Sequence, residues 1–289
     1  MNQGGSPEIP AHLPEKLAIS FWYWGWITAA LPDEPYGDLQ QCMVELKERG
    51  FNAIRVDAGY NWCFNLDGTA RGEMAFGPWM LDGSHGITME KGGGRHDVLK
   101  RVVRLMELAK QYDVYVILTS WEYQDSTSFV SDAKIREEVF AIPKENRLLH
   151  MARQLDRLIS TLKDRDLDKN IAFVEPHNEI EYSDFPKGQA GKGLHAEAIA
   201  FLRDAHPDIL VSGDFQVHDR RQVPDNVQVY DIHMYAGIAM YHDILYRQTV
   251  WHPDFKEHHD PSRVETFRLL LIALRVAKVN GTDMPMSLA

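Results

Sequence analysis

The sequence predicts an α/β protein whose parallel strands alternate with helices in the manner of a (β/α)₈ TIM barrel. Three observations support this prediction. Short apolar runs alternate with helical patterns along nearly the whole chain, and parallel strands need such helical crossovers. The runs are mostly apolar throughout, as expected for strands that are covered on both faces. The 289 residues fit a single barrel domain, and we see no domain boundary within residues 1–289.

The expected strands are short apolar runs bounded by polar or turn residues. The first is followed by a cluster of aromatic residues, and the second by Asp57. They lie at residues 17–21, 51–56, 114–118, 171–174, 209–211 and 227–232, and a seventh begins near Met284.

Helices are expected where apolar residues recur at helical spacing. The clearest start is Asp38, which is followed three residues later by Gln41 in the pattern of a capping box. Gly50 is a typical residue at the end of such a helix. Two long stretches, 58–94 and 234–261, are expected as loops that narrow a cleft. Further helices are expected around residues 98–109, 148–162, 194–202 and 264–279.

A doubly wound nucleotide-binding sheet is the competing architecture. Such a sheet carries a Gly-rich turn directly after its first strand, whereas here residues 22–26 read Trp-Tyr-Trp-Gly-Trp. The glycines at 92–94 precede a helix but follow a long loop. We therefore favour a barrel, incomplete at its C-terminus because an eighth strand has no counterpart before Ala289.

The composition excludes several classes of partner. With 31 Lys and Arg against 42 Asp and Glu, the net charge is −11, so we expect neither nucleic-acid nor membrane-surface binding. No stretch approaches the roughly 20 apolar residues of a spanning helix. The N-terminus shows no signal-peptide core, so a cytoplasmic protein is expected, with secretion as the alternative if the N-terminus is incomplete. Cys42 and Cys63 make neither a disulfide framework nor a zinc motif.

Aromatic and acidic residues follow the expected strands, where a barrel gathers its chemistry. Aromatic faces stack on the C–H faces of sugars, and carboxylates pair with sugar hydroxyls, so this inventory predicts a carbohydrate ligand with Trp24, Trp62 and Trp121 in contact with it. The alternative for any one tryptophan is ordinary core packing. In strand order the residues are Trp22, Trp24 and Trp26; Arg55, Asp57, Tyr60 and Trp62; Trp121, Glu122 and Tyr123; Glu175, His177, Asn178 and Glu179; Asp214, Gln216 and His218; Asp231, His233 and Tyr235.

Three of these groups together resemble the glycoside hydrolases of clan A, nearest to the family 5 cellulase and mannanase type. Residues 50–56 (GFNAIRV), which contain Arg55, look like that family's second strand. Asn178-Glu179 looks like its fourth-strand Asn-Glu pair, and His233-Met234-Tyr235 looks like its His-x-Tyr on strand six. The resemblance covers nearly the whole chain at the level of motifs.

The resemblance implies a retaining β-glycoside hydrolase that acts on a β-linked glucan, mannan or related glycoside and needs no cofactor. Glu179 would be the general acid/base, and Asn178 would bind the sugar 2-hydroxyl. Arg55 would support the nucleophile, Tyr235 would touch it, and His233 would place it or the substrate. Two carboxyl groups about 5–5.5 Å apart, one protonated and one ionised, are what this mechanism requires.

The sequence also departs from the family. Ser120-Trp121-Glu122 stands where the family has a histidine after strand three, and Ile180 stands where a proline is common. The family's nucleophile is a Glu at the end of strand seven, and the ending at residues 284–289 looks like the segment that leads to it. We therefore expect a fragment of a longer reading frame, with little or no glycosidase activity of its own.

Two other functions fit the same residues. Glu175, Asp214 and His233 could ligate a divalent metal in a sugar isomerase of the barrel type. A non-catalytic sugar-binding barrel would keep the cleft without the nucleophile. Glu175 could point into the barrel as a supporting carboxylate or pair with Arg55.

Overall fold

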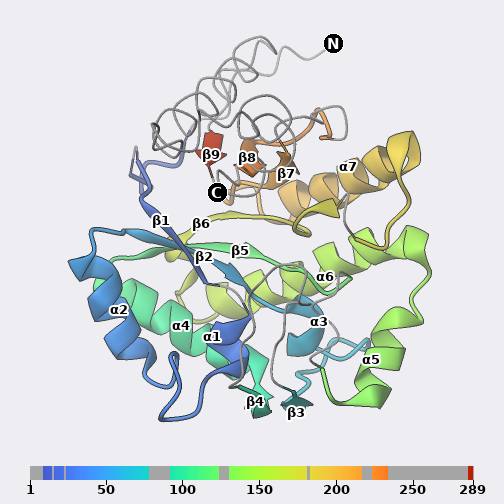
Figure 1. Ribbon diagram of the computed structural model, residues 1–289. Helices are drawn as coiled ribbons and strands as arrows, with labels where there is room; N and C mark the ends of the chain where they lie inside the picture. The colour runs from blue at the N-terminus through green and yellow to red at the C-terminus, as the bar shows by residue number, and fades with distance from the viewer. Residues whose placement is uncertain are drawn as a thin grey trace, which may run out of the picture.

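The computed structural model describes residues 9–14, 16–22, 24–77, 92–123, 130–180, 183–216, 223–233 and 286–288 (Figure 1). Of residues 214–216, 232, 233 and 286–288 only the backbone is described. The expected helix at 264–279 and loop at 234–261 therefore lie outside the described residues.

Seven parallel strands form the centre of the described chain. The strands β1 (Ile19–Trp22), β2 (Ala53–Asp57), β5 (Tyr115–Thr119) and β6 (Ile171–Val174) pair in that order. A second parallel set contains β7 (Ser212–Gln216), β8 (Val229–His233) and β9 (Met286–Leu288). A parallel bridge between Val174 and Val211 joins the two sets.

The ring of strands is curved. Strand β8 is four strand steps from β2 in the order of pairing, which is about 19 Å in a flat sheet. The side chain of Arg55 on β2 nevertheless lies 3.1 Å from that of Asp231 on β8. Only a sheet that curls toward a barrel brings these residues together, so the described strands form most of a barrel wall, as predicted.

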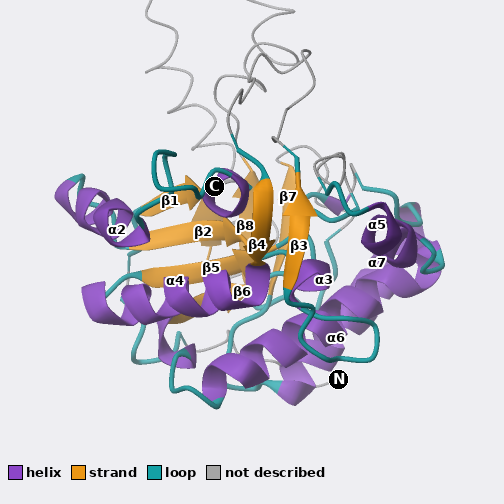
Figure 2. Cartoon of the chain, turned by 90° about the horizontal axis from the view of Figure 1, so that it is seen from below, coloured by secondary structure: helices purple, strands orange, loops and turns teal. Residues whose placement is uncertain are grey.

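The helices cover the outside of this wall. Figure 1 shows α2, α4 and α6 on one side of β1, β2, β5 and β6, and Figure 2 shows the helices outside the strands from below. The bounds are α1 Gly25–Thr28, α2 Leu39–Glu48, α3 Tyr60–Cys63, α4 Val98–Tyr112, α5 Ala133–Phe140, α6 Lys144–Lys163 and α7 Gly188–Ala205, with a 3₁₀ turn at Asp168–Asn170.

Helix starts follow local side-chain chemistry. Asp38 caps α2 by accepting hydrogen bonds from the backbone N–H groups of Gln40 and Gln41, which satisfies two of the helix's unpaired donors. The Gln41 side chain donates to Glu45 instead of completing the expected capping box. Asp97 and Asp132 cap α4 and α5 in the same way.

Two expectations for individual elements were wrong, and one helix was not expected. The stretch 58–94 contains α3 and β3 (Glu73–Phe76), which pairs antiparallel with β4 (Gly94–Asp97), rather than loop alone. Helix α5 was missed, because Val139 is its only buried residue and its apolar stripe is short. The fifth strand begins at Ser212 rather than Ile209, because the apolar run at 209–211 is buried as the approach to the strand.

The apolar core has two layers separated by the strands. The larger lies between strands and helices and includes Met43, Leu105 and Leu155. The smaller contains Ile117, Phe173 and Val229. In the strand register Phe21 lies beside Arg55, Arg55 beside Ile117, and Ile117 beside Phe173. Because register partners share a face of the sheet, Arg55 faces the inner layer.

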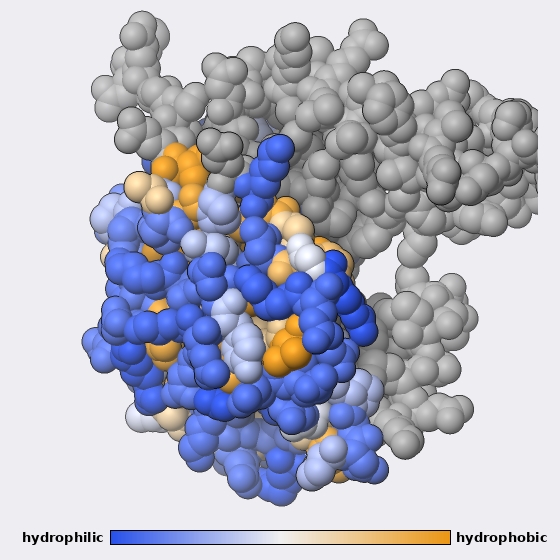
Figure 3. Space-filling view, turned by 90° about the vertical axis from the view of Figure 1, so that its left-hand side faces the viewer, coloured by the Kyte–Doolittle hydropathy of each residue, from blue (hydrophilic) through white to orange (hydrophobic). Residues whose placement is uncertain are grey.

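The outer surface is largely polar. Where described residues show in Figure 3, the face is mostly hydrophilic, with small separate hydrophobic patches. Among the described helices, none is both long and apolar enough to cross a membrane. The exposed large apolar residues of the described part are Ile9, Phe21, Leu31 and Leu66.

Candidate active site

Arg55 is the centre of a buried polar network at the carboxyl ends of the strands. Its Nη2 donates to Glu175 Oε2 over 2.5 Å and to Asn178 Oδ1 over 2.7 Å. Its Nε forms an ion pair of 3.1 Å with Asp231 Oδ2. The Arg55 side chain is 2% exposed and both carboxylates are 0% exposed. One guanidinium therefore serves two buried carboxylates and also fixes the orientation of the Asn178 amide.

Strand β5 positions the segment that carries Asn178 and Glu179. The backbone N–H of Glu175 donates to Leu118 O over 2.9 Å, and that of Asn178 donates to Ser120 O over 2.8 Å. These bonds continue the pairing of β5 and β6 beyond the strand ends. Asn178 is fully buried, whereas Glu179 is half-buried.

Glu179 has an unusual backbone conformation. Its φ is 45°, in the left-handed region that side chains other than those of Gly, Asn and Asp rarely adopt. The Ser183 hydroxyl donates to its carbonyl over 3.2 Å and helps to hold this turn. A residue held in such a conformation at the end of a strand is a candidate for function.

His177, as a neutral ring, is hydrogen-bonded to the same turn. Its Nε2 accepts from the backbone N–H of Tyr123 over 3.4 Å, so Nδ1 carries the proton and donates to Asn178 O over 2.6 Å. Burial lowers the pKa of His177 to about 3, which keeps the ring uncharged at neutral pH. Phe185 packs edge-on to it with ring centroids 4.7 Å apart.

The aromatic residues expected at the rim are mostly buried. Trp24 and Trp62 are 0% exposed and Trp121 is 2% exposed, so these rings pack in the core and present no open face. Their role as sugar contacts stays a prediction. The accessible aromatic beside Arg55 is Phe21, which is 46% exposed. The Arg55 guanidinium lies 5.7 Å from the Phe21 ring centroid and 5.4 Å from that of Trp121.

The remaining candidate residues are described less fully. His233 ends β8, two residues after Asp231, and only its backbone is described. Tyr235 lies outside the described residues. Arg55, Asn178 and Asp231 do converge, although they come from β2, the segment after β6, and β8. Sequence reasoning did not foresee Phe21 and the pairing of Asp231 with Arg55, whereas the pairing of Glu175 with Arg55 was one of its two alternatives.

A family model described as sugar-binding cellulase-like matches residues 19–253. The chain belongs to this cellulase-like family. No curated protein matches the sequence.

Solved structures with the same fold include several glycoside hydrolases. One from Parabacteroides distasonis ATCC 8503, provisionally named a glycoside hydrolase, has 16% identity and a TM-score of 0.59, covering 92% of this chain and 68% of that one. A glycoside hydrolase family 5 enzyme from Prevotella bryantii B14 has 14% identity and a TM-score of 0.52, covering 92% and 73%. An endoglucanase has 16% identity and a TM-score of 0.50, covering 92% and 76%. At these identities the likeness shows the fold of the cellulase-like chain.

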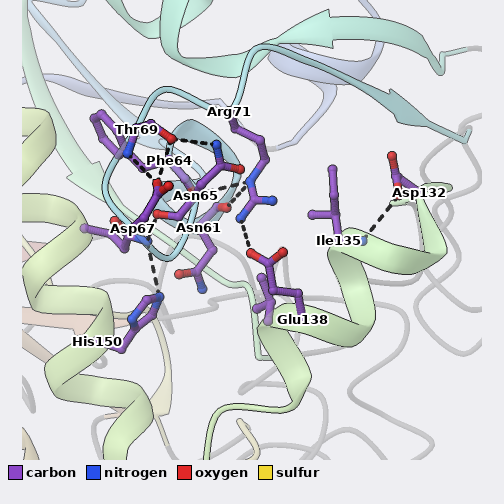
Figure 4. A network of polar contacts seen from close by, with 12 residues as sticks. Asn61, Phe64, Asn65, Asp67, Thr69, Arg71, Asp132, Ile135, Glu138 and His150 are labelled. Atoms are coloured by element: carbon purple, nitrogen blue, oxygen red, sulfur yellow. Dashed lines mark hydrogen bonds and ion pairs between the residues drawn. The ribbon is translucent and has the colours of Figure 1, made fainter.

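The turn after β2 is fastened to α5 through Arg71 (Figure 4). The Arg71 Nε donates to the backbone carbonyls of Asn61 and Phe64 over 3.1 and 3.2 Å. Its Nη2 forms an ion pair of 3.1 Å with Glu138, and the Arg71 side chain is only 3% exposed. This arginine therefore fixes the turn that contains Trp62 on one flank of the site.

Replacing Arg71 by alanine is expected to lower the free energy of unfolding by about 2–3 kcal/mol, because two carbonyl groups lose a buried charged donor. Urea unfolding at fixed pH measures the change. Arg104→Ala is the matched control, since Arg104 pairs with Glu107 at an exposed position and should cost less than about 1 kcal/mol. Equal losses of unfolding free energy in the two variants would show that the buried contacts of Arg71 contribute little to stability.

Proposed function

We propose that the chain binds β-linked glucan or mannan chains at the carboxyl ends of its parallel strands, with Glu179 as the general acid/base of a retaining glycosidase reaction. The hydrogen bond between Arg55 and Asn178 is the main observation in favour of this function. Arg55 and Asn178 are 123 positions apart in sequence and are joined by a 2.7 Å hydrogen bond directly beside Glu179. Two of the residues that carry the family resemblance, Arg55 and Asn178, thus meet beside a third, Glu179, near the strand ends where barrel enzymes place their chemistry.

The proposed reaction begins with Glu179 protonated. Its proton passes to the glycosidic oxygen as the bond from that oxygen to the anomeric carbon breaks, and the anomeric carbon forms a bond to the second carboxylate of the reaction. Asn178, which is fully buried with its amide oxygen on Arg55, holds Glu179 in position for this proton transfer. Glu179, now ionised, then removes a proton from the water that attacks the anomeric carbon and displaces the second carboxylate.

The second carboxyl group of the reaction is not among the described candidates. Glu175 and Asp231 are fully buried on Arg55, so neither is open to an anomeric carbon. The resemblance places the nucleophile directly after the strand that follows β8. What the described residues support is therefore sugar binding and proton transfer by Glu179.

Phe21 is the described residue best suited to contact a sugar face. It is half-exposed, lies next to Arg55 in the strand register, and is backed by Trp121 at a centroid distance of 5.4 Å. A glucan fits the endoglucanase among the structural neighbours. Titration of the chain with cello- and manno-oligosaccharides, followed by calorimetry, tests binding.

Phe21→Ala is expected to weaken oligosaccharide binding about tenfold, because the sugar loses an apolar face worth about 1–1.5 kcal/mol. Leu66→Ala is the matched control, since Leu66 has the same exposure, 45% against 46%, on a different turn, and affinity should not change. Absence of binding to any β-linked gluco- or manno-oligosaccharide by the wild-type chain would overturn the proposal.

Hydrolysis is tested separately with an aryl β-glycoside. Turnover that Glu179→Gln abolishes would support the full reaction in this chain. Binding without turnover would leave the sugar-binding function and remove the cleaving step from this chain. The metal-isomerase alternative is not favoured, because Glu175, one of its three donors, is already held by a guanidinium.

A further inference from the structure

A second group of buried carboxyl groups lies beside the Arg55 network. The Ser120 hydroxyl contacts both Asp57 and Glu122: its oxygen is 3.3 Å from Asp57 Oδ1 and closer still to Glu122 Oε2. All three residues are 0% exposed. Within the described residues, neither carboxyl group forms an ion pair with a lysine or arginine. Two carboxyl groups therefore share one hydroxyl in the interior.

Counting protons shows that one of these carboxyl groups is neutral. Two hydrogen bonds among three oxygen atoms need two protons, and the Ser120 hydroxyl supplies only one. If both carboxyl groups were ionised, one of the two contacts would place a carboxylate against the hydroxyl lone pairs without a proton between them. The second proton must therefore reside on Asp57 or on Glu122.

The surrounding donors assign that proton to Glu122. Asp57 Oδ1 accepts from the Gly59 backbone N–H over 3.2 Å, and Oδ2 has no hydrogen-bond partner among the described residues. A proton on Oδ2 would therefore not reach Ser120, and a proton on Oδ1 would make a hydroxyl oxygen, a poorer acceptor, the partner of the Gly59 N–H. Glu122 Oε1 accepts from the Asn61 backbone N–H over 3.0 Å. Its Oε2 then donates to Ser120, which donates to Asp57, and every proton has an acceptor.

We propose that Asp57 and Glu122 hold one proton between them, carried on Glu122, and that this proton fastens the Tyr60–Cys63 turn to the barrel and weakens the fold as the pH rises. The turn is tied to Glu122 through Asn61. The Tyr60 hydroxyl in turn donates to the backbone carbonyl of Glu175 over 2.9 Å, three residues before Asn178. Release of the proton to solvent leaves two buried carboxylates on a single hydroxyl, directly behind the candidate active site.

Burial raises the pKa of both carboxyl groups, that of Glu122 to about 8. An ionised Glu122 would raise the pKa of Asp57 further, so the two groups do not ionise independently. The other titratable or charged groups that interact with the pair are Arg55 on β2, Tyr60 and Cys63 on α3, and Tyr123 after β5. Around these lie Arg71 and Asp97, which act on Cys63, and Glu175, which acts on Tyr60.

The sign of the pH dependence follows from linkage. In the unfolded chain Glu122 ionises near its ordinary pKa of 4.5, whereas in the folded chain it keeps its proton up to about pH 8. Its stabilising contribution is therefore fully present below about pH 4.5 and is lost as the pH rises to about 8. Over this window the folding equilibrium constant should fall by about tenfold per pH unit.

The test is urea unfolding of the 289-residue chain and of its Glu122→Gln variant between about pH 5 and about pH 8. Glutamine keeps a donor for Ser120 and an acceptor for Asn61 but cannot ionise. The ratio of the wild-type to the variant folding constant should fall about tenfold per pH unit. Glu145→Gln, at an exposed position on α6, is the control and should run parallel to wild type. If Glu122→Gln also runs parallel to wild type, the proposal is wrong.

Asp57→Asn distinguishes which carboxyl group holds the proton. If Asp57→Asn removes the pH slope while Glu122→Gln keeps it, the assignment to Glu122 is overturned. Infrared difference spectra can be recorded on the wild-type chain alone, so this test does not depend on the folding of a variant. Between about pH 6 and about pH 9 the spectra should show the loss of the signal of a protonated carboxyl group. If no such signal is lost, the proposal is wrong. None of these measurements involves a sugar, so their outcome does not depend on whether the proposed function is correct.

Discussion

Replacement of Arg55 by alanine should lower the free energy of unfolding by about 3–5 kcal/mol, because it leaves Glu175 and Asp231 buried without their shared cation. A loss of this size is comparable with the whole stability of many domains, so the variant should unfold at low urea or fail to accumulate. Arg55→Lys should recover little of the loss, since one ammonium cannot reproduce a fork that reaches Glu175, Asp231 and Asn178 together.

The matched control is Arg49→Ala. Arg49 pairs with Glu45 on the surface of α2, where its side chain is 70% exposed, and its loss should cost less than about 1 kcal/mol. A double-mutant cycle of Arg55→Met with Glu175→Gln should show strong coupling, because the second substitution removes a charge from which the first has taken the guanidinium. Additive effects in that cycle would contradict the interpretation of Arg55 as the charge partner.

Arg147→Ala should destabilise the chain by about 3 kcal/mol for a different reason. The Arg147 guanidinium donates to three backbone carbonyls, those of Phe140, Ile142 and Asp184, and stacks over the Tyr123 ring at 4.6 Å. Its side chain is 5% exposed. Removal leaves buried acceptors unsatisfied, and each such group costs about 1–3 kcal/mol before overlap between them.

The control for Arg147 is the other partner of Asp184. Lys144 also contacts the Asp184 carboxylate but is 57% exposed, so Lys144→Ala should cost less than about 1 kcal/mol. Urea midpoints at an unchanged denaturant slope compare the two variants. A large loss of stability in Lys144→Ala would show that the ion pairs with Asp184, rather than the hydrogen bonds from Arg147 to backbone carbonyls, hold the segment after Glu179.

The order of strands and helices could be predicted because the local signals agree with the fold. The apolar run at 171–174 became β6, and Asp38 capped α2 as its side chain suggested. The hairpin of β3 and β4 could not be predicted in the same way. Its strands contain polar residues such as Glu73, Arg95 and His96, and their pairing depends on contacts between distant parts of the chain.

The polar centre of the site was only partly predictable. Arg55, Asn178 and Glu179 could be named from motif and strand order, and the structure brings them to one place. The exposure of aromatic rings could not be predicted, because the sequence does not say which face of a strand or turn packs inward. Trp24 and Trp62 are therefore in the core, while Phe21, a residue within β1, is exposed beside Arg55.

The positive φ of Glu179 has a consequence for engineering the chain. The other described non-glycine residues with positive φ are Asp113 and Asp166, and aspartate tolerates this region better than glutamate does. Glycine at position 179 would relax the backbone, so a sequence optimised for thermal stability alone would discard this carboxyl group. Engineering for higher thermal stability should therefore leave position 179 unchanged, because stability favours glycine there and the proposed chemistry requires glutamate.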